Sequence, residues 1–443
     1  MNHRSASALI VAAVAVAGGW LGARRLGAFE PLAARAASVE RPAMSEVTQR
    51  DTQIRVWTTA LQQDPASAIA LTQLSGLYLQ RARETGDDQS YEKAEEYARR
   101  SLALRTNRNG PAFVTLASAL VAQHRFQEAE RVAKNLVAFD PDVPQYRAQL
   151  GEIQMELGEY DAARQSFDSL YKVRTHLSIA PRLARWAEVN GNSTLARKLV
   201  SDALAEAKTR RNLPKEQLAW FHLRMGDIDM RNGRMRGART MFGKGLEIEP
   251  DDYRLLDAMA QLEAVERHPK KAIEYGERGI ATKLDPATLG TIGDAYAALG
   301  ENGKAESYFK TMEVAVSGQP GAYHRAWSLF LLDHNRRIPE VLANVRTEIE
   351  TRKDIYGYDL LAWALHKAGR DSEARIAMNN ARHLGTRDAT MFYHAGMIER
   401  SLGDVRRARY FLSEALKVNP SFHPTHPSEV RAVLDSLDHK GKS

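Results

Sequence analysis

The sequence predicts an all-α protein, a right-handed α-solenoid in which about ten helical hairpins stack in series. Three observations lead to this prediction. A small residue recurs along the chain at intervals of 33 to 35 residues, apart from two intervals of 42: Ser75, Ala117, Gly151, Ala184, Gly226, Ala260, Gly293, Ser328, Ala362 and Gly396. An alanine usually follows 12 positions later, and a bulky apolar residue usually follows four positions after that. Glycines tend to lie between the two halves of each unit.

Residues 150–170 show the pattern most clearly. Apolar side chains recur there at spacings of three and four, which indicates two amphipathic helices, and Gly158 separates them. We expect Gly151 and Ala163 to lie where the two helices cross, because a larger side chain would push the backbones apart. Phe167 would then fill the space toward the next hairpin. A single hairpin cannot bury its apolar face alone, so the units must stack on one another.

This pattern resembles the tetratricopeptide repeat (TPR) family, whose repeats have a period near 34 residues. The resemblance covers roughly residues 68 to 420. Two units depart from it. The first contains an insertion at residues 83–89, and the eighth has Glu340 where alanine is expected, directly after Pro339. Because proline breaks helices, Pro339 predicts a kink or a local rearrangement.

The repeats divide the chain into five segments. Their predicted bounds are 1–26 for a signal peptide or membrane anchor, 27–50 for a linker, 51–66 for an N-terminal capping helix, 67–420 for the TPR array, and 421–443 for a C-terminal capping helix and tail. Val430, Val433, Leu434 and Leu437 form the apolar stripe of that last helix. This division leaves no room for a separate catalytic domain.

The N-terminal segment predicts targeting to the cell envelope. His3 and Arg4 precede an uncharged run from Ser5 to Ala23, and Arg24 and Arg25 follow at once. This layout is typical of a signal peptide, and it also allows retention as a transmembrane helix. The arginines after the run favour a cytoplasmic position for the repeats by the positive-inside rule, whereas the signal-like layout favours export. Cleavage and the side of the membrane are therefore both left open.

Composition argues against several classes of function. The formal net charge is +7, but residues 1–50 alone hold six arginines and three glutamates, so the repeats are only mildly basic and we expect no nucleic-acid partner. Cysteine is absent, which excludes disulfides and thiolate metal sites. No phosphate-binding loop, nucleophile elbow or zinc-protease motif is present, so we expect neither an enzyme nor a cofactor.

His423 and His426 are the one pair of histidines with a spacing that a metal ion could share. Pro424 and Pro427 interrupt the helix that would orient them, and Glu429 is the nearest carboxylate in the sequence. The sequence therefore predicts a loop with polar histidines and no metal site.

The resemblance to TPR proteins implies a concave face built mostly from the first helix of each hairpin, where a protein or peptide partner binds. Aromatic, methionine and arginine side chains on such a face are the types that anchor interfaces. The candidates in units nine and ten are Tyr356, Trp363, Tyr393, Met397 and Arg400, and those in units four and five are Arg185, Trp220 and Arg231. Packing between hairpins is the other interpretation of Trp363 and Tyr393.

These observations predict a non-catalytic scaffold that binds a protein segment in its concave groove and associates with a membrane through its N-terminal segment. The alternative is a glycan- or lipid-binding regulator of envelope polymer or pilus biogenesis, and a third hypothesis is an enzyme whose site no motif reveals. The partner and the oligomeric state are not predicted.

Overall fold

The computed structural model describes residues 45–317 and 325–440. The chain divides into two units, residues 1–52 and 53–443. Of the first unit only residues 45–52 are described, and helix α3 (Glu46–Gln63) begins there. The predicted signal or anchor segment lies outside the described residues. Within the described ranges, no helix is both long and apolar enough to cross a membrane.

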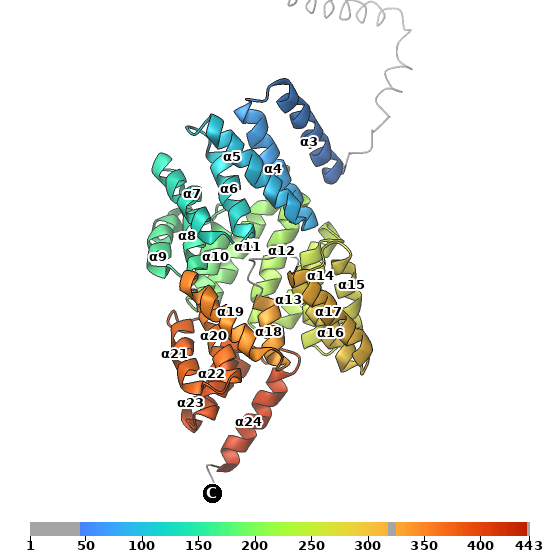
Figure 1. Cartoon of the computed structure of the whole chain (residues 1–443), viewed down its shortest axis with the longest axis vertical. Helices are drawn as coiled ribbons and strands as arrows, with labels where there is room; N and C mark the ends of the chain where they lie inside the picture. The colour runs from blue at the N-terminus through green and yellow to red at the C-terminus, as the bar shows by residue number, and fades with distance from the viewer. Residues whose placement is uncertain (1–44, 318–324, 441–443) are drawn as a thin grey trace, which may run out of the picture. The chain divides into compact units, whose positions relative to one another are not determined.

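Ten helical hairpins follow one another along the described part of the second unit (Figure 1). In order, these repeat units are α4 (Ala68–Thr85) with α5 (Asp88–Leu104), α6 (Gly110–Ala122) with α7 (Phe126–Phe139), α8 (Pro144–Leu157) with α9 (Tyr160–Asp168), α10 (Ala180–Val189) with α11 (Ser193–Thr209), α12 (Lys215–Arg231) with α13 (Met235–Ile248), α14 (Tyr253–Val265) with α15 (Pro269–Ile280), α16 (Pro286–Ala298) with α17 (Asn302–Ser317), α18 (Arg325–Asp333) with α19 (Ile338–Thr351), α20 (Ile355–Lys367) with α21 (Asp371–Ala381), and α22 (Ala389–Ser401) with α23 (Val405–Val418). A 3₁₀ helix, η1 (Ser169–Val173), follows α9. The predicted fold class is confirmed.

Where the small residue of the first helix is glycine, a bulky side chain of the second helix approaches it closely. A Cβ atom added at Gly226 would lie 2.2 Å from Phe242, and one added at Gly293 would lie 2.3 Å from Phe309. Phe242 is fully buried. The predicted close crossing is therefore present, and the ring sixteen positions later is what requires the glycine.

In the first irregular unit, most of the inserted residues form helix. Helix α4 continues to Thr85, and Gly86 ends it in the left-handed conformation, with φ of +67°. Asp87 then caps α5 by accepting a hydrogen bond from the backbone N–H of Gln89. The inserted residues thus lengthen the hairpin without breaking the series.

Pro339 does not kink a helix. It lies in the first turn of α19, where the backbone N–H that proline lacks would have no partner within the helix. The expectation of a kink at this position is therefore wrong. The prediction assumed that Pro339 lies inside a helix, whereas helix α19 begins beside it at Ile338.

Turns of the early units contact loops that lie almost 200 residues further along the chain. The hydrogen bonds of these contacts include those from Lys353 N to Leu157 O (3.1 Å), from Ile355 N to the Tyr160 hydroxyl (2.8 Å), from Asn419 Nδ2 to Met230 O (2.9 Å), and from Thr386 Oγ1 to Val189 O. Units three, four and five thereby meet the loops that precede unit nine, precede unit ten and follow unit ten. Figure 1 shows α8 beside the orange helices of units eight and nine.

The glycines in these turns lie against the opposing backbone. Gly158 has φ of +79°, and a Cβ atom there would lie 2.3 Å from Lys353 O; at Gly191, with φ of +75°, it would lie 2.5 Å from Gly385 O. Gly403 has nearly the same φ, +77°, but no atom lies within 4 Å of its added Cβ. Glycine at 158 and 191 is therefore required both by the backbone conformation and by the contact.

Apolar side chains of the first and last described helices pack against the array. Ile54, Trp57 and Leu61 of α3 pack against α4. At the other end, Val430 and Val433 of α24 (His426–Lys440) are 0% and 5% exposed. The apolar stripe of the C-terminal helix is thus part of the core.

Candidate functional site

The eight residues predicted to bind a partner divide into buried and accessible ones. Trp363 is 2% exposed. Its indole Nε1 donates a hydrogen bond of 2.9 Å to Asp333, and its ring stacks on His394 with the centroids 4.2 Å apart. The structure therefore gives Trp363 a packing role between hairpins, which is one of the two roles that the sequence left open.

Tyr393 and Met397 are also buried, at 2% and 9% exposed. The ring of Tyr393 stacks on His426, with centroids 4.3 Å apart, and its hydroxyl donates a hydrogen bond of 2.7 Å to Glu429. Both partners belong to α24, so the C-terminal helix covers this part of the first helix of unit ten. Arg400, one helical turn beyond Met397, is exposed.

Tyr356 approaches the candidates of units four and five. Burial raises the pKa of its hydroxyl to about 12, and the charges of Asp388, Arg231 and Arg185 are close enough to act on it. The contact between Leu157 and Lys353 explains this proximity, because it holds the start of α20 against the third unit. The structure thus brings Tyr356 together with Arg185 and Arg231, which the sequence had assigned to two separate patches.

Carboxylates of the array neutralise the arginines at this place. Glu188 of α10 accepts hydrogen bonds from Arg231 (2.8 Å) and Arg224 (3.1 Å) of α12. Arg185 pairs with Glu156, which also accepts from Arg352 at 3.0 Å. Because each guanidinium already has an anionic partner, this cluster offers little attraction to an anionic ligand. Trp220, at the start of the same face on α12, is partly exposed and packs edge-on against Phe221.

Among the described residues, no lysine, arginine or histidine forms a salt bridge with Asp257 of α14. Its carboxylate accepts hydrogen bonds from two neutral groups, the hydroxyl of Thr288 (2.9 Å) and the amide of Gln261 (2.8 Å). Burial, followed by the nearby carboxylates of Asp285 and Asp227, raises its pKa to about 7, against the opposing effect of the hydrogen bonds from Thr288 and Gln261.

The sequence did not single out Asp257, because interface anchors were sought among aromatic and arginine side chains. Its repeat position carries a signal, since it lies three residues before Ala260, in the same register that places Tyr393 three residues before Gly396. That register predicts the face on which the side chain lies. It does not predict the proximity of Asp285, which comes from the loop before the next unit.

Asp257→Asn is expected to stabilise the protein at alkaline pH. The pKa of Asp257 is higher in the folded state than in the unfolded chain. The folded state therefore binds more protons between about pH 4 and pH 7. As the pH rises through that range, this carboxyl lowers the free energy of unfolding. We expect equal stability of parent and variant near pH 4 and a gain of about 1 to 2 kcal/mol at pH 8, after allowance for partial exposure. Urea unfolding at both pH values measures the difference in the free energy of unfolding between the parent and Asp257→Asn. A difference that does not change with pH would contradict the raised pKa of Asp257.

Comparisons with known proteins give one family match and several similar solved structures. Residues 114–175 match the family model described as "Tetratricopeptide repeat". Among solved structures, the chain is similar to a human IFIT1 dimer with PPP-AAAA (12% identity, 84% of this chain and 87% of that chain, TM-score 0.44). It is also similar to a tetratricopeptide repeat protein from Parabacteroides merdae (16% identity, 58% and 98%, TM-score 0.40) and to yeast Tom70 (11% identity, 85% and 96%, TM-score 0.34). No curated protein matches the sequence.

The hairpins define the fold class of this protein. It is an α-solenoid of helical hairpins, and one segment of it, residues 114–175, matches the tetratricopeptide repeat model.

Proposed function

We propose that the protein is a non-catalytic scaffold that binds a protein segment carrying lysine or arginine on the concave face of units five to seven, α12, α14 and α16. The observation that carries this proposal is the Asp257 carboxyl, which has only two neutral side-chain hydrogen-bond partners, Thr288 and Gln261, and lies near other carboxylates. A cationic side chain of a partner supplies the missing countercharge.

The energetics of burial support a cationic partner. A buried carboxylate is costly unless it is paired and hydrogen-bonded. When an ammonium or guanidinium group reaches Asp257, the carboxyl loses its proton and accepts a charge-assisted hydrogen bond, which is about twice as strong as a neutral one. The arginines nearby are already paired, so they do not compete for Asp257.

The surroundings of Asp257 suit a peptide better than a small cation. Trp220 and Met230 of α12 are partly exposed apolar side chains at concave-face positions of the neighbouring unit. Stacked repeats present such side chains along an extended surface. An extended segment with a basic residue between apolar ones would contact both kinds of group.

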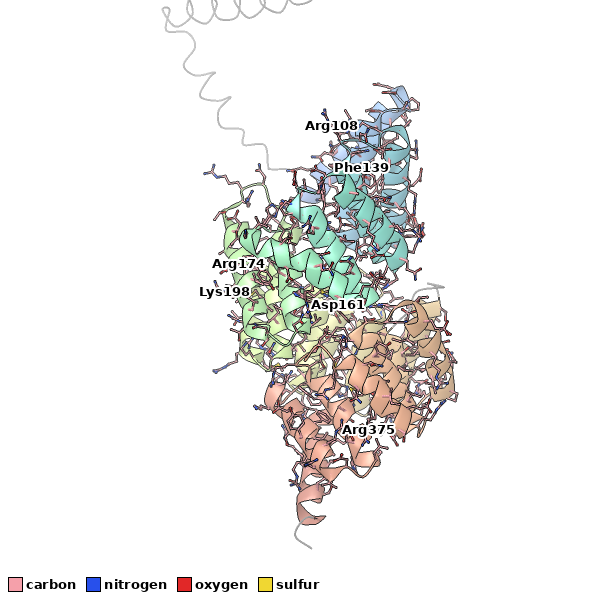
Figure 2. The ribbon with its side chains drawn as sticks, turned by 90° about the vertical axis from the view of Figure 1, so that its left-hand side faces the viewer. Arg108, Phe139, Asp161, Arg174, Lys198 and Arg375 are labelled. Atoms are coloured by element: carbon pink, nitrogen blue, oxygen red, sulfur yellow. The ribbon has the colours of Figure 1, made fainter. Side chains whose placement is uncertain are left out.

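Selection from a library of displayed peptides tests this proposal. The parent protein is expected to enrich peptides with lysine or arginine, and Asp257→Asn is expected to bind them at least about tenfold more weakly. Asp161→Asn is the matched control, because Asp161 is an exposed carboxylate on α9 (Figure 2). Enrichment of acidic or uncharged peptides, or equal binding by both variants, would contradict the proposal.

The proposed location is the cell envelope, reached through residues 1–26. The uncharged run from Ser5 to Ala23 supports this proposal. Removal of residues 1–40 is expected to give a soluble, folded protein, and a reporter fused after Ser443 reveals the side of the membrane. A cytosolic full-length protein would rule the location out.

We do not propose the glycan- or lipid-binding alternative. It requires the aromatic side chains of units nine and ten to be accessible, and Trp363 and Tyr393 are each 2% exposed.

A further inference from the structure

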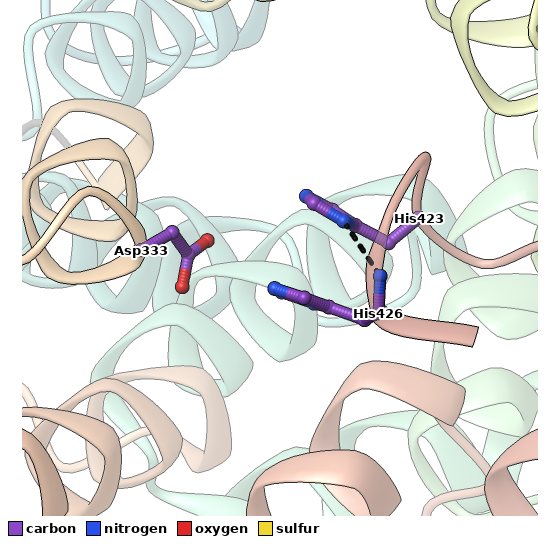
Figure 3. Close-up of side chains that lie close together, drawn as sticks. All are labelled: Asp333, His423 and His426. Atoms are coloured by element: carbon purple, nitrogen blue, oxygen red, sulfur yellow. Dashed lines mark hydrogen bonds between the residues drawn. The ribbon is translucent and has the colours of Figure 1, made fainter. Parts of the chain in front are cut away.

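Two histidines near the C-terminus lie beside a carboxylate from a distant helix. His423 belongs to the loop after α23, His426 is the first residue of α24, and Asp333 is the last residue of α18. One possible ligand atom of each residue lies within 4.8 Å of those of the other two. The imidazole rings are nearly parallel with centroids 3.7 Å apart, and Figure 3 shows both rings extending toward the Asp333 carboxylate.

Neighbouring side chains hold two of these groups in place. Trp363 Nε1 donates a hydrogen bond of 2.9 Å to Asp333, and the ring of Tyr393 stacks on His426. Metal-binding carboxylates and imidazoles are commonly oriented by such second contacts. The arrangement therefore exists before any ligand binds.

The cluster lacks the direct hydrogen bonds that would satisfy it. His426 is 8% exposed, and its Nδ1 has no hydrogen-bond partner. Within residues 325–440, no hydrogen bond joins Asp333 to either imidazole. His423 Nδ1 has three local contacts: the Thr425 hydroxyl at 3.2 Å and the backbone N–H groups of Thr425 and His426 at 3.3 and 3.4 Å. A buried nitrogen without a partner calls for an explanation, and it marks His426 as a side chain with free hydrogen-bonding or ligating capacity.

We propose that Asp333, His423 and His426 bind a divalent transition-metal ion, with Zn²⁺ the ion of best fit. Two imidazoles and a carboxylate are ligands that zinc favours, and a fourth position remains for water. A cavity of about 490 Å³ reaches His423, and its lining also includes Glu266 and His268. The ion would join the loop before α24 to unit eight and so hold the capping helix in place.

A second group with similar spacing serves as a comparison. Glu263, Glu266 and His268 also lie within 4.8 Å of one another. Arg239 already pairs with both of these glutamates, and His268 bonds to Glu263 at 2.9 Å. A metal ion would have to displace the guanidinium, so we expect no zinc there.

Titration of the full-length protein with ZnCl₂ tests the proposal by calorimetry and thermal unfolding. The parent is expected to bind one zinc ion per chain and to unfold at a higher temperature with zinc. His423→Ala and Asp333→Asn are expected to bind at least about tenfold more weakly, and His268→Ala is expected to bind like the parent. His423 is partly exposed, so its replacement is expected to leave the fold intact, which circular dichroism without zinc verifies.

Asp333→Asn keeps an oxygen to accept the Trp363 hydrogen bond and therefore separates loss of ligation from loss of folding. The proposal is overturned if the parent binds no zinc at about 0.1 mM, an affinity threshold of roughly −5 kcal/mol. It is equally overturned if His268→Ala weakens binding as much as His423→Ala does.

Discussion

Gly158→Ala is expected to lower the free energy of unfolding by about 3 kcal/mol, whereas Gly403→Ala is expected to lower it by about 1 kcal/mol. Both glycines have a positive φ, +79° and +77°, so alanine carries the same backbone strain at each. Only at Gly158 would the added Cβ also overlap an opposing backbone, at 2.3 Å from Lys353 O. The difference between the two variants therefore measures the contact between unit three and the loop before unit nine.

Urea unfolding followed by circular dichroism gives both values. Repeat arrays can unfold in parts, so the complete curves are compared as well as the midpoints. Equal destabilisation of the two variants would show that the long-range contact contributes nothing to stability.

Trp363→Ala is expected to lower the free energy of unfolding by about 3 to 5 kcal/mol, as large aromatic truncations in cores do. The change removes the stacking on His394 and the hydrogen bond to Asp333. Arg400→Ala, on the neighbouring first helix, is expected to change stability by less than about 0.5 kcal/mol, because Arg400 is exposed. Thermal and urea unfolding of the two variants provide the comparison.

The Trp363→Ala and Arg400→Ala variants also decide between the two roles that the sequence left open for Trp363, packing between hairpins and binding a partner. A Trp363→Ala variant that is as stable as the parent but no longer binds a partner would identify Trp363 as an interface residue. A strongly destabilised variant would confirm that it packs between units nine and ten.

The hairpins could be predicted from the sequence because the contacts that build them are local. Gly226 meets Phe242 sixteen residues later, and the same spacing recurs in unit after unit. The apolar stripe of α24 is similarly local, since Val430 and Val433 lie one helical turn apart. Periodicity is sufficient for such contacts.

The candidate sites depend on contacts that periodicity does not predict. Lys353 reaches Leu157 across almost 200 residues because small rotations between successive repeats add up, and no single repeat encodes the sum. The same accumulation brings Asp333 to His423, although Glu429 is the nearest carboxylate in the sequence. The prediction of a polar loop at His423 and His426 considered only carboxylates that are near in the sequence.

The central claim is that Asp257 receives a cationic side chain, and the pH dependence of peptide binding tests it most directly. With a pKa of about 7, the ionised fraction of Asp257 rises from roughly one tenth at pH 6 to nine tenths at pH 8. If only the ionised form binds, affinity for an arginine-containing peptide rises about tenfold over this range. Arginine itself stays charged throughout, so the change reports on the protein.

Affinities of a selected peptide for the parent, Asp257→Asn and Asp161→Asn are therefore measured at pH 6 and pH 8. The account predicts that the parent and Asp161→Asn bind about tenfold more tightly at pH 8, while Asp257→Asn binds weakly and equally at both. A parent affinity that is the same at pH 6 and pH 8, or the same rise in Asp257→Asn, would contradict it.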